Sequence, residues 1–299
     1  MLSIIVCSRN KNLSEVFVSN IAKTIGVDYE VIVIDNSKNK YSIFSAYNLG
    51  FAKSKNPYLC FVHDDVMFHN QKWGEKVIAH LQENETGIIG LAGGSLATRI
   101  PVSWSKLMPS ANLIQSDITG KKHSKIIQYP ANFENSKHSV ILLDGVFLCM
   151  RRELMNNIKF DENLSGFHGY DYDISIQSTI AGFTNYVVYD IVLEHFSTGE
   201  TSAKYYLNLI SIFKKWEKFL PLIGSSVSES ERAHISEIEE KFLLKLPKIL
   251  SRKGISTTEI IFETKHFAEV IGSDKTNSKL FFLRYKLMFV RLFKYRKTH

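Results

Sequence analysis

Residues 58–65 read Tyr-Leu-Cys-Phe-Val-His-Asp-Asp, an apolar run that ends in one imidazole and two carboxylates. An apolar run of this length bounded by polar residues predicts a buried strand over 58–62. His63, Asp64 and Asp65 follow it directly, and neighbouring carboxylates at the end of a buried strand are costly unless a cation or a basic side chain neutralises them. A divalent metal with phosphate oxygens is one such neutraliser. The alternative is that one Asp caps the following turn while the others face water.

The pattern of strand, polar exit and helix continues on both sides of this stretch. Runs of β-branched and aromatic residues predict further strands at 2–7, 29–34, 86–91, 140–150 and 186–193, and apolar residues at helical spacing predict helices at 12–25, 42–53 and 73–82. Such alternation predicts an α/β fold with a mostly parallel central sheet and helices on both faces. In open sheets of this kind, ligands bind beyond the carboxyl ends of the strands. The residues directly after each strand are therefore the first candidates for a site.

Charge divides the chain near residue 202. Residues 1–202, the predicted α/β domain, hold 18 Lys and Arg against 20 Asp and Glu (net −2), and 203–299 hold 19 against 10 (net +9), which together give the formal charge of +7. The second part is predicted to be mainly helical, with helices at 203–220, 228–250, 256–271 and 278–296. Its basic surplus indicates an anionic partner, unless it is a solvated lysine-rich surface. Within the first part, residues 96–138 carry three prolines and are predicted to form a long irregular insertion.

Further candidate site residues lie outside this first stretch. Asp35 and His195 each follow a predicted strand, and His is the commonest side-chain metal ligand. Asp171 and Asp173 lie in a glycine-punctuated segment that could aim a carboxylate at a ligand. One of these two is predicted to be the N-cap of a helix over 174–181.

Several functional classes are excluded or disfavoured. The three cysteines, Cys7, Cys60 and Cys149, lie in apolar runs without a CxxC spacing, which predicts buried thiols in a reducing compartment. The N-terminus lacks the basic segment of a signal peptide, and no apolar stretch reaches the roughly 18 residues of a membrane span, so we expect a cytoplasmic protein. GxGxxG, P-loop and HExxH motifs are absent, and nucleic acid is not an expected partner.

Taken in chain order, these motifs resemble those of a family-two-like glycosyltransferase of the GT-A fold, in its bacterial glycosyltransferase-like branch. The resemblance covers residues 1 to about 200 and rests on segments at 2–7, 33–37, 48–50, 58–65, 144–147 with Arg151-Arg152, and 169–173, and on His195. It implies an enzyme that transfers a sugar from a nucleotide-sugar, most often a UDP-sugar, with the help of Mn²⁺ or Mg²⁺. A GT-A domain over 1–202 would then precede the helical region 203–299, with 96–138 as the acceptor-facing loop.

The resemblance also implies roles by position. Asp65 matches the last Asp of the family's Asp-x-Asp metal motif, His63 stands in place of the first, and His195 matches a later metal ligand. Asp171 matches the general base, with Asp173 as second candidate, and a single displacement would invert the anomeric carbon. The donor-binding residues would be Cys7, Ser8, Arg9 and Asp35 around the nucleoside, Asn48 and Asp64 near the nucleotide and its diphosphate, and Asp144 and Gly145 facing the sugar.

Two further features concern the acceptor, which we expect to be a glycan or a lipid-linked sugar in the synthesis of a surface polysaccharide. Trp104 is predicted either to stack on a sugar ring or to pack the 96–138 segment onto the domain. Within 278–299, the stretch 279–297 holds seven basic residues and no acid. This predicts either an interfacial helix at the inner face of the cytoplasmic membrane or a helix packed against protein.

Two other functions remain open on the sequence. A nucleotidyltransferase or phosphotransferase could use the same Asp-based metal site and would transfer the nucleotide rather than the sugar. A non-catalytic protein that binds a nucleotide-sugar or a glycan could keep the fold, and His63 in place of an Asp makes this conceivable. Asp171 discriminates, because a binder would tolerate Asp171→Asn whereas an inverting enzyme would lose turnover.

Overall fold

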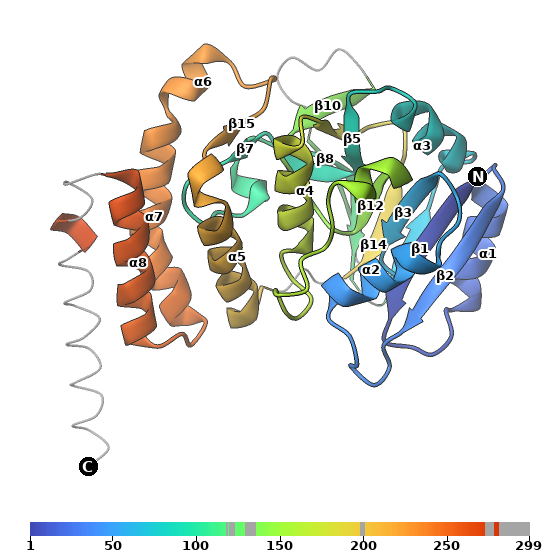
Figure 1. Cartoon of the computed structure of the whole chain (residues 1–299), viewed down its shortest axis with the longest axis horizontal. Helices are drawn as coiled ribbons and strands as arrows, with labels where there is room; N and C mark the ends of the chain where they lie inside the picture. Colours follow the sequence, from blue (N-terminus) through green and yellow to red (C-terminus); the bar gives the residue numbers. More distant parts are fainter. Residues whose placement is uncertain (118, 120–122, 129–135, 198–200, 273–277, 281–299) are drawn as a thin grey trace. The chain divides into compact units, whose positions relative to one another are not determined.

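The computed structural model describes residues 1–117, 119, 123–128, 136–197, 201–272 and 278–280 (Figure 1). The chain divides into two compact units. The first comprises Met1–Ala97, Ser103–Glu200 and Leu222–Val227, and the second comprises Thr98–Val102, Thr201–Pro221 and Ser228–His299. Apart from 278–280, the predicted basic helix at the C-terminus lies outside the described residues. Where the structure describes the chain, no helix is both long and apolar enough to span a membrane.

A central sheet organises the first unit. Its strands, as far as the chain is described, run in the order β10-β13-β5-β12-β3-β1-β2. β1 pairs in parallel with β2 and β3, and β13 in parallel with β5, whereas β12 lies antiparallel between β3 and β5 and β10 antiparallel at the edge. Five of these strands therefore share one direction, which confirms the mostly parallel sheet. Their bounds are β1 (Leu2–Ser8), β2 (Tyr29–Asp35), β3 (Tyr58–Val62), β5 (Thr86–Gly90), β10 (Lys137–Val140), β12 (Phe147–Arg151) and β13 (Thr184–Val188).

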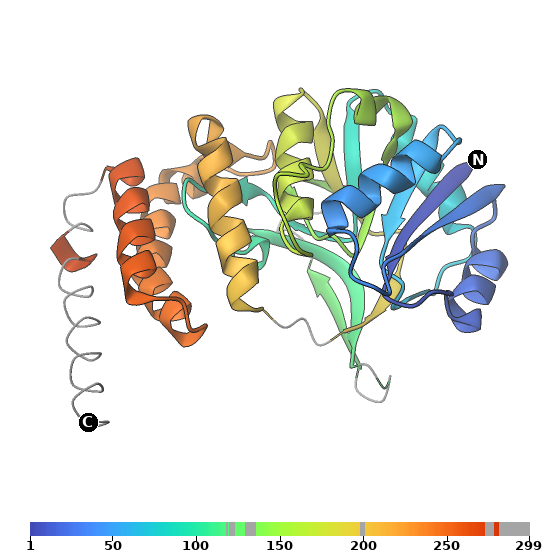
Figure 2. The same ribbon diagram turned by 60° about the horizontal axis from the view of Figure 1, so that its bottom comes forward.

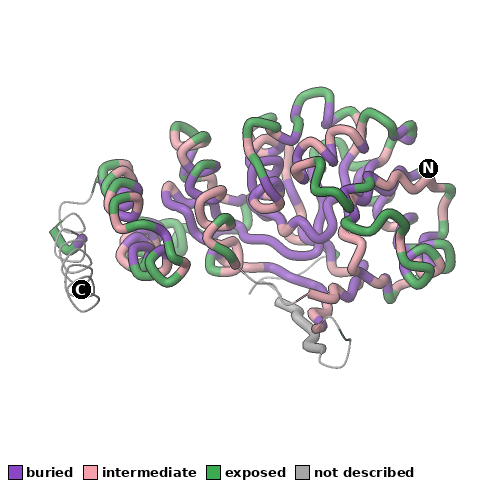
Figure 3. Tube along the Cα trace, turned by 90° about the horizontal axis from the view of Figure 1, so that it is seen from below, coloured by how far each residue is buried: buried purple, intermediate pink, exposed green. Residues whose placement is uncertain are grey.

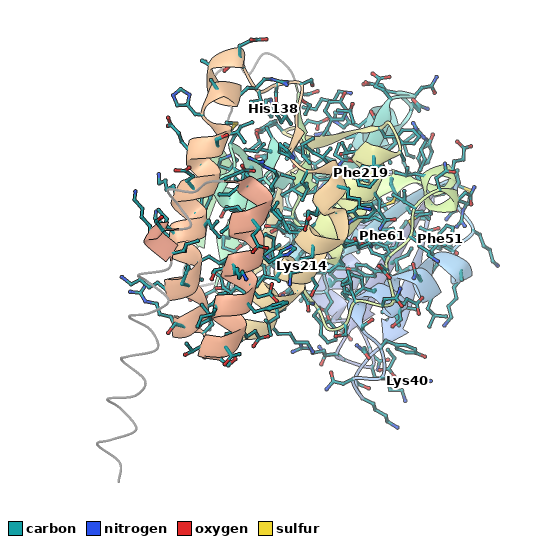
Figure 4. The ribbon with its side chains drawn as sticks, turned by 60° about the vertical axis from the view of Figure 1, so that its left-hand side comes forward. Lys40, Phe51, Phe61, His138, Lys214 and Phe219 are labelled. Atoms are coloured by element: carbon teal, nitrogen blue, oxygen red, sulfur yellow. The ribbon has the colours of Figure 1, made fainter. Side chains whose placement is uncertain are left out.

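Helices cover both faces of this sheet, as predicted. Successive strand residues point to opposite faces, so Ile4 packs in one core with Phe17 of α1 (Glu15–Thr24) and Val77 of α3 (Trp73–Leu81). The next residue, Ile5, packs in the other core with residues of α2 (Ile43–Lys53) and α4 (Tyr170–Ile180). Figure 2 shows α2 and α4 on the same side of the strands. The central strands are buried along most of their length (Figure 3), and Phe61 of β3 is among the fully buried side chains (Figure 4).

A second sheet extends the first unit, with strand order β11-β6-β8-β14-β4 and β9 paired to β8. The prediction of an irregular insertion over 96–138 is wrong for its middle part, because residues 109–116 form β8 between β6 and β14. The single strand predicted over 140–150 is also wrong: it is split into β10, β11 and β12, with Asp144-Gly145 in the break before β12. The bounds are β4 (Val66–Phe68), β6 (Ala92–Gly94), β8 (Pro109–Ser116), β9 (His123–Gln128), β11 (Leu142–Leu143) and β14 (Leu193–Phe196).

Short elements complete this unit. A two-stranded pairing joins β7 (Leu96–Ala97) to β15 (Leu222–Ile223), so a segment from late in the chain returns to the first unit. Two 3₁₀ turns, η1 (Trp104–Lys106) and η2 (Arg152–Asn156), follow β7 and β12. The strand predicted over 186–193 is likewise two strands, β13 and β14.

The second unit, taken by itself, is mainly helical, as predicted. Its elements are α5 (Ala203–Trp216), η3 (Glu217–Phe219), α6 (Glu229–Ala233), α7 (Ile235–Arg252) and α8 (Thr257–Ile271). Lys214 of α5 (Figure 4) forms an ion pair of 2.5 Å with Glu263 of α8. The Arg99 guanidinium binds both carboxylate oxygens of Glu239 on α7, at 2.6–3.2 Å, and the Arg99 backbone N–H donates to the same carboxylate. This ion pair matters because the Glu239 side chain is fully buried.

Candidate active site

Three predicted metal ligands, His63, Asp65 and His195, lie together at the carboxyl end of β3. His63 and Asp65 occupy the short link between β3 and β4. His195 comes from β14, which runs antiparallel to β4 with His195 opposite Val66. The Phe196 N–H donates to the Asp65 carbonyl at 2.8 Å and ties the two strands at this point. A strand pairing between segments far apart in sequence therefore completes the cluster.

The cluster has the geometry of a cation site. Nδ1 of His63 lies 3.8 Å and Nε2 of His195 lies 3.4 Å from Oδ1 of Asp65, and the two imidazole centroids are 5.4 Å apart. The ligand atoms of all three residues lie within 4.8 Å of one another. Oδ1 of Asp65 is a buried oxygen that accepts no hydrogen bond from the described residues. Because an orphaned buried carboxylate oxygen is costly, these residues fit a bound cation.

Protonation in the cluster also suits a metal. Burial, and then the neighbouring His195, lowers the pKa of His63. Burial alone would raise the pKa of Asp65, but the imidazoles of His195 and His63 outweigh it and hold the pKa below its ordinary value. A neutral imidazole and an ionised carboxylate are the forms that coordinate a metal.

Asp171 lies in the first turn of α4, beside the Asp144-Gly145 break. Its Oδ2 accepts from the Gly145 N–H and its Oδ1 accepts from the Tyr172 N–H, both at 3.0 Å. Burial first, and the charge of Asp144 second, raises the pKa of Asp171 to about 7, against the backbone hydrogen bonds of Tyr172, Asp171 and Gly145, which lower it. A carboxylate held rigidly with a pKa near neutrality can accept a proton from a substrate hydroxyl.

The second candidate base, Asp173, has different surroundings from those of Asp171. Its side chain is fully buried and its Oδ2 accepts from Nε2 of Gln177 at 2.8 Å. A base without accessible surface cannot reach an acceptor hydroxyl, so the burial argues against Asp173. The predicted N-cap is also wrong: α4 begins at Tyr170 and its N-cap is Gly169, which has φ +85°. The left-handed conformation favours glycine and leaves both aspartates inside the helix.

The predicted nucleoside residues lie at the ends of the neighbouring strands β1 and β2. Ser8, at the end of β1, donates from Oγ to Oδ2 of Asp64 at 2.5 Å. Asp35, paired with Ser8 in the parallel register, is exposed, and its pKa is lowered by hydrogen bonds from Ser37. The Arg9 guanidinium lies 5.2 Å from the centroid of the Phe167 ring. These polar groups are thus gathered at the strand edge where ligands bind in this type of sheet.

Two other predicted donor residues have different surroundings. Burial raises the pKa of the Cys7 thiol to about 11, so the thiol stays neutral. Cys7 is therefore not a reactive group at this strand end. The Asn48 amide is bound to another segment: Nδ2 donates to the Phe160 carbonyl and to Glu162, both at 2.8 Å, and Oδ1 accepts from the Phe160 N–H. Asn48 therefore holds the 160–162 segment, and its amide is engaged there rather than with the residues at the strand ends.

Comparison with known proteins identifies the family. The model of the glycosyltransferase-like family matches residues 3–198, which is well over half of the chain. The chain belongs to the glycosyltransferase-like family. This membership confirms the resemblance to glycosyltransferases drawn from the motifs, and the structure confirms the expected α/β domain with a mostly parallel central sheet, followed by a mainly helical region.

Similar solved structures are distant. A crystal structure of GalNAc-T7 with UDP, GalNAc and Mn²⁺ is 12% identical, covers 78% of this chain and 53% of its own, and has a TM-score of 0.49. A crystal structure of S. aureus TarS 1-349 in complex with UDP-GlcNAc is 13% identical, covers 91% and 88%, and has a TM-score of 0.48. The chain spans about half the length of the GalNAc-T7 chain. No curated protein matches the sequence significantly. With identities and TM-scores this low, the assignment rests on the family match.

Two further residues contact the site: Tyr170, to which the motifs assigned no role, and Trp104, which the sequence placed either on a sugar ring or against the domain. The Tyr170 hydroxyl lies between Nε2 of His63, at 2.8 Å, and the Gly145 carbonyl, at 2.9 Å. Trp104 packs against Ala92, Ala111 and Leu113 and donates from Nε1 to Oδ2 of Asp144 at 3.1 Å. Trp104 thus packs its segment onto the domain. The contacts of Tyr170 with His63 and of Trp104 with Asp144 each join segments at least 40 residues apart, so no local sequence pattern predicts them.

Proposed function

We propose that this protein is a metal-dependent, inverting glycosyltransferase that moves a sugar from a UDP-sugar to a hydroxyl of a glycan or lipid-linked acceptor. The observation that carries the proposal is that a three-residue cation site and a carboxylate with a pKa of about 7 are connected through the Tyr170 hydroxyl and the backbone of one residue, Gly145. Transfer from a nucleoside diphosphate requires both groups, because charge grows on the departing phosphate while the acceptor hydroxyl loses a proton.

His63, Asp65 and His195 would hold the cation, which would act as a Lewis acid toward the departing diphosphate. Two imidazoles and one carboxylate form a donor set for a first-row transition ion such as Mn²⁺ rather than for Mg²⁺, which prefers oxygen ligands and water. We therefore propose Mn²⁺ as the metal. Asp64 is held by Ser8 at the same strand end.

Asp171 is the proposed general base. Both of its oxygens accept a backbone N–H, so the carboxylate keeps one orientation. Above a pH of about 7 it is ionised and can take the proton of an acceptor hydroxyl as that oxygen attacks the anomeric carbon. Attack on the face opposite the departing diphosphate inverts the configuration, and no second nucleophilic carboxylate is needed.

Thermal unfolding tests whether the protein binds a nucleotide-sugar with the help of a metal. The purified wild-type chain and Asp65→Asn are each unfolded with UDP-, GDP-, CMP- and dTDP-sugars, with and without Mn²⁺. A ligand that binds the folded state raises the melting temperature. We expect a Mn²⁺-dependent rise with UDP-sugars in the wild-type chain and none in Asp65→Asn. A rise with another nucleotide class would overturn the UDP assignment, and no rise with any donor would favour a glycan-binding function.

The catalytic arm needs a separate measurement. Hydrolysis or transfer from the donor identified above should release UDP in the wild-type chain and not in Asp171→Asn, while Asp171→Asn keeps the Mn²⁺-dependent thermal shift. Release of a nucleoside monophosphate with transfer of a sugar phosphate would instead indicate a phosphotransferase. Equal donor binding with no turnover in either chain would indicate a binding protein.

We also propose that residues 279–297 hold the enzyme on an anionic membrane, where lipid-linked acceptors for a surface polysaccharide reside. The charge of this stretch, seven basic residues and no acid, supports the proposal. Flotation of the full chain with liposomes containing anionic lipid, compared with a chain lacking 278–299, tests it. We expect flotation that falls with added salt and is lost on deletion. Equal flotation of the two chains would contradict the proposal.

A further inference from the structure

The Tyr170 hydroxyl occupies a central position between the proposed metal site and the proposed base. Tyr170 is the first residue of α4 and its side chain is buried. Its ring packs edge-on against Phe44 and Tyr47, which fixes where the hydroxyl lies. From that position the hydroxyl oxygen contacts Nε2 of His63 at 2.8 Å and the Gly145 carbonyl oxygen at 2.9 Å.

The direction of these two hydrogen bonds follows from the number of protons available. A carbonyl oxygen can only accept, so the single hydroxyl proton of Tyr170 is donated to Gly145. With its proton donated to Gly145, the hydroxyl must accept from its other two neighbours, Nε2 of His63 and the Tyr47 hydroxyl, which makes Nε2 of His63 the donor. In a neutral imidazole only one nitrogen carries a proton. Nδ1 of His63 therefore has a free lone pair, and this is the nitrogen that lies 3.8 Å from Oδ1 of Asp65.

The same glycine contacts Asp171 through its other polar group. The Gly145 carbonyl accepts from Tyr170, and the Gly145 N–H donates to Oδ2 of Asp171 at 3.0 Å. A side chain at this position is excluded, because a Cβ on Gly145 would lie 2.1 Å from the Tyr170 hydroxyl oxygen. The close approach of Tyr170 to this backbone thus depends on glycine. His63, Tyr170, Gly145 and Asp171 form one continuous series of contacts.

We propose that Tyr170 is a positioning residue that orients both halves of the site. It fixes His63 in the tautomer whose Nδ1 faces Asp65, and by binding the Gly145 carbonyl it holds the backbone at Gly145, whose N–H on the preceding peptide orients Asp171. The proposal rests on the proposed function, since it assigns the two halves to a metal and a base. In this proposal Tyr170 acts through His63 and Gly145. Groups that hold a metal-ligating histidine in this way commonly change metal affinity by about 10- to 100-fold when removed.

Tyr170→Phe is the variant that tests the proposal, with Tyr186→Phe as the matched control. The Tyr170→Phe substitution keeps the ring and its packing and removes only the hydroxyl. Tyr186 lies in the same unit, on β13, where Lys137 lies over its ring 4.2 Å from the centroid, a contact that Phe would keep. The first readout is the His63 tautomer in the metal-free chain, from ¹⁵N NMR of the imidazole at about pH 8, where the ring is neutral. We expect protonated Nε2 in the wild-type and control chains and a mixture in Tyr170→Phe.

The second readout is Mn²⁺ binding, measured by the loss of the free-ion electron paramagnetic resonance signal. We expect an affinity about 10- to 100-fold lower in Tyr170→Phe and unchanged in Tyr186→Phe. The third is the kcat for UDP release at saturating Mn²⁺, which should stay reduced in Tyr170→Phe because the Gly145 contact to Asp171 is loosened. Full recovery of kcat at saturating Mn²⁺ would remove the Asp171 half of the proposal.

Failure of this inference can be told apart from failure of the proposed function. A wild-type chain with protonated Nδ1 on His63 overturns the inference without any variant or any activity. A wild-type chain that binds Mn²⁺, with a Tyr170→Phe chain that binds it equally well, also overturns the inference and leaves the metal site standing. A wild-type chain that binds no Mn²⁺ contradicts the proposed metal dependence, and the tautomer then still decides whether Tyr170 orients His63.

Discussion

Replacing Asp171 by Asn should remove a loss of stability that the wild-type protein shows as the pH rises, while strongly reducing sugar transfer. In the folded chain the pKa of Asp171 is raised from an ordinary 3.8 to about 7, mainly by burial. The unfolded chain therefore releases this proton at a lower pH than the folded chain. The wild-type protein should lose stability as the pH rises from about 4 to about 7, and the loss should be complete above that range. The amide introduced by Asp171→Asn mimics the neutral acid at every pH and should escape this loss.

The magnitude follows from the size of the shift. A difference of about three pKa units corresponds to about 4 kcal/mol, at about 1.4 kcal/mol per unit. Asp171 is only half-buried, so solvent screening reduces the figure, and we expect about 2 kcal/mol. The two backbone hydrogen bonds to the carboxylate are already contained in the pKa of about 7 and add nothing further. The amide has one acceptor oxygen in place of two, so Asp171→Asn loses one backbone hydrogen bond, a cost that does not change with pH. Relative to that constant cost, we expect the stability of Asp171→Asn to rise against the wild type by about 2 kcal/mol between about pH 4 and about pH 8.

The assay is urea unfolding of both chains at a series of pH values, with the difference in unfolding free energy plotted against pH. Titrating groups that do not interact with Asp171 cancel in the difference. Glu30→Gln serves as the control, because hydrogen bonds, chiefly from Ser3, lower the pKa of Glu30, so its difference should change with pH in the opposite direction. A flat difference for Asp171→Asn would refute the raised pKa and the base assignment that uses it. The same variant should lose about 10²- to 10⁴-fold in kcat while donor binding is kept.

Three further variants test other parts of the molecule. Asp65→Asn should abolish Mn²⁺ binding by paramagnetic resonance with little loss of thermal stability, because it removes the only charged donor of the cluster; retained binding would exclude Asp65 as a ligand. Gly145→Ala should lower the free energy of unfolding by about 1–3 kcal/mol in urea, since the new Cβ would lie 2.1 Å from the Tyr170 hydroxyl oxygen; wild-type stability would show that α4 can shift freely. Arg99→Met should lower the free energy of unfolding in urea by about 3–5 kcal/mol, because it leaves the Glu239 carboxylate buried without its partner. Adding Glu239→Gln should recover part of this loss, and additive losses in the double variant would contradict the pairing.

The sequence by itself determined the elements and the edge of the sheet where the site lies. Apolar runs locate β1, β2, β3 and β5 to within a residue or so, and serines at positions 14 and 42 accept the backbone N–H groups at the starts of α1 and α2. The sequence also predicts that the polar residues after these strands lie close together, because parallel strands end at one common edge of the sheet. His63, Asp65 and His195 were predicted in this way. His63 and Asp65 lie just after β3, and His195 lies near the end of β14.

Tertiary structure alone decided which of these polar residues act together. Asp171 and Asp173 are two residues apart and look alike in sequence, yet the helix turns one toward Gly145 and buries the other against Gln177. β8 was not predicted, because its own sequence shows no clear strand pattern. What makes it a strand is its pairing with β6 on one side and with β14, from much later in the chain, on the other. The contact between His63 and Tyr170 spans 107 residues. Local patterns carry helical and strand periodicity, whereas hydrogen bonds and desolvation depend on which distant segments the fold brings into contact.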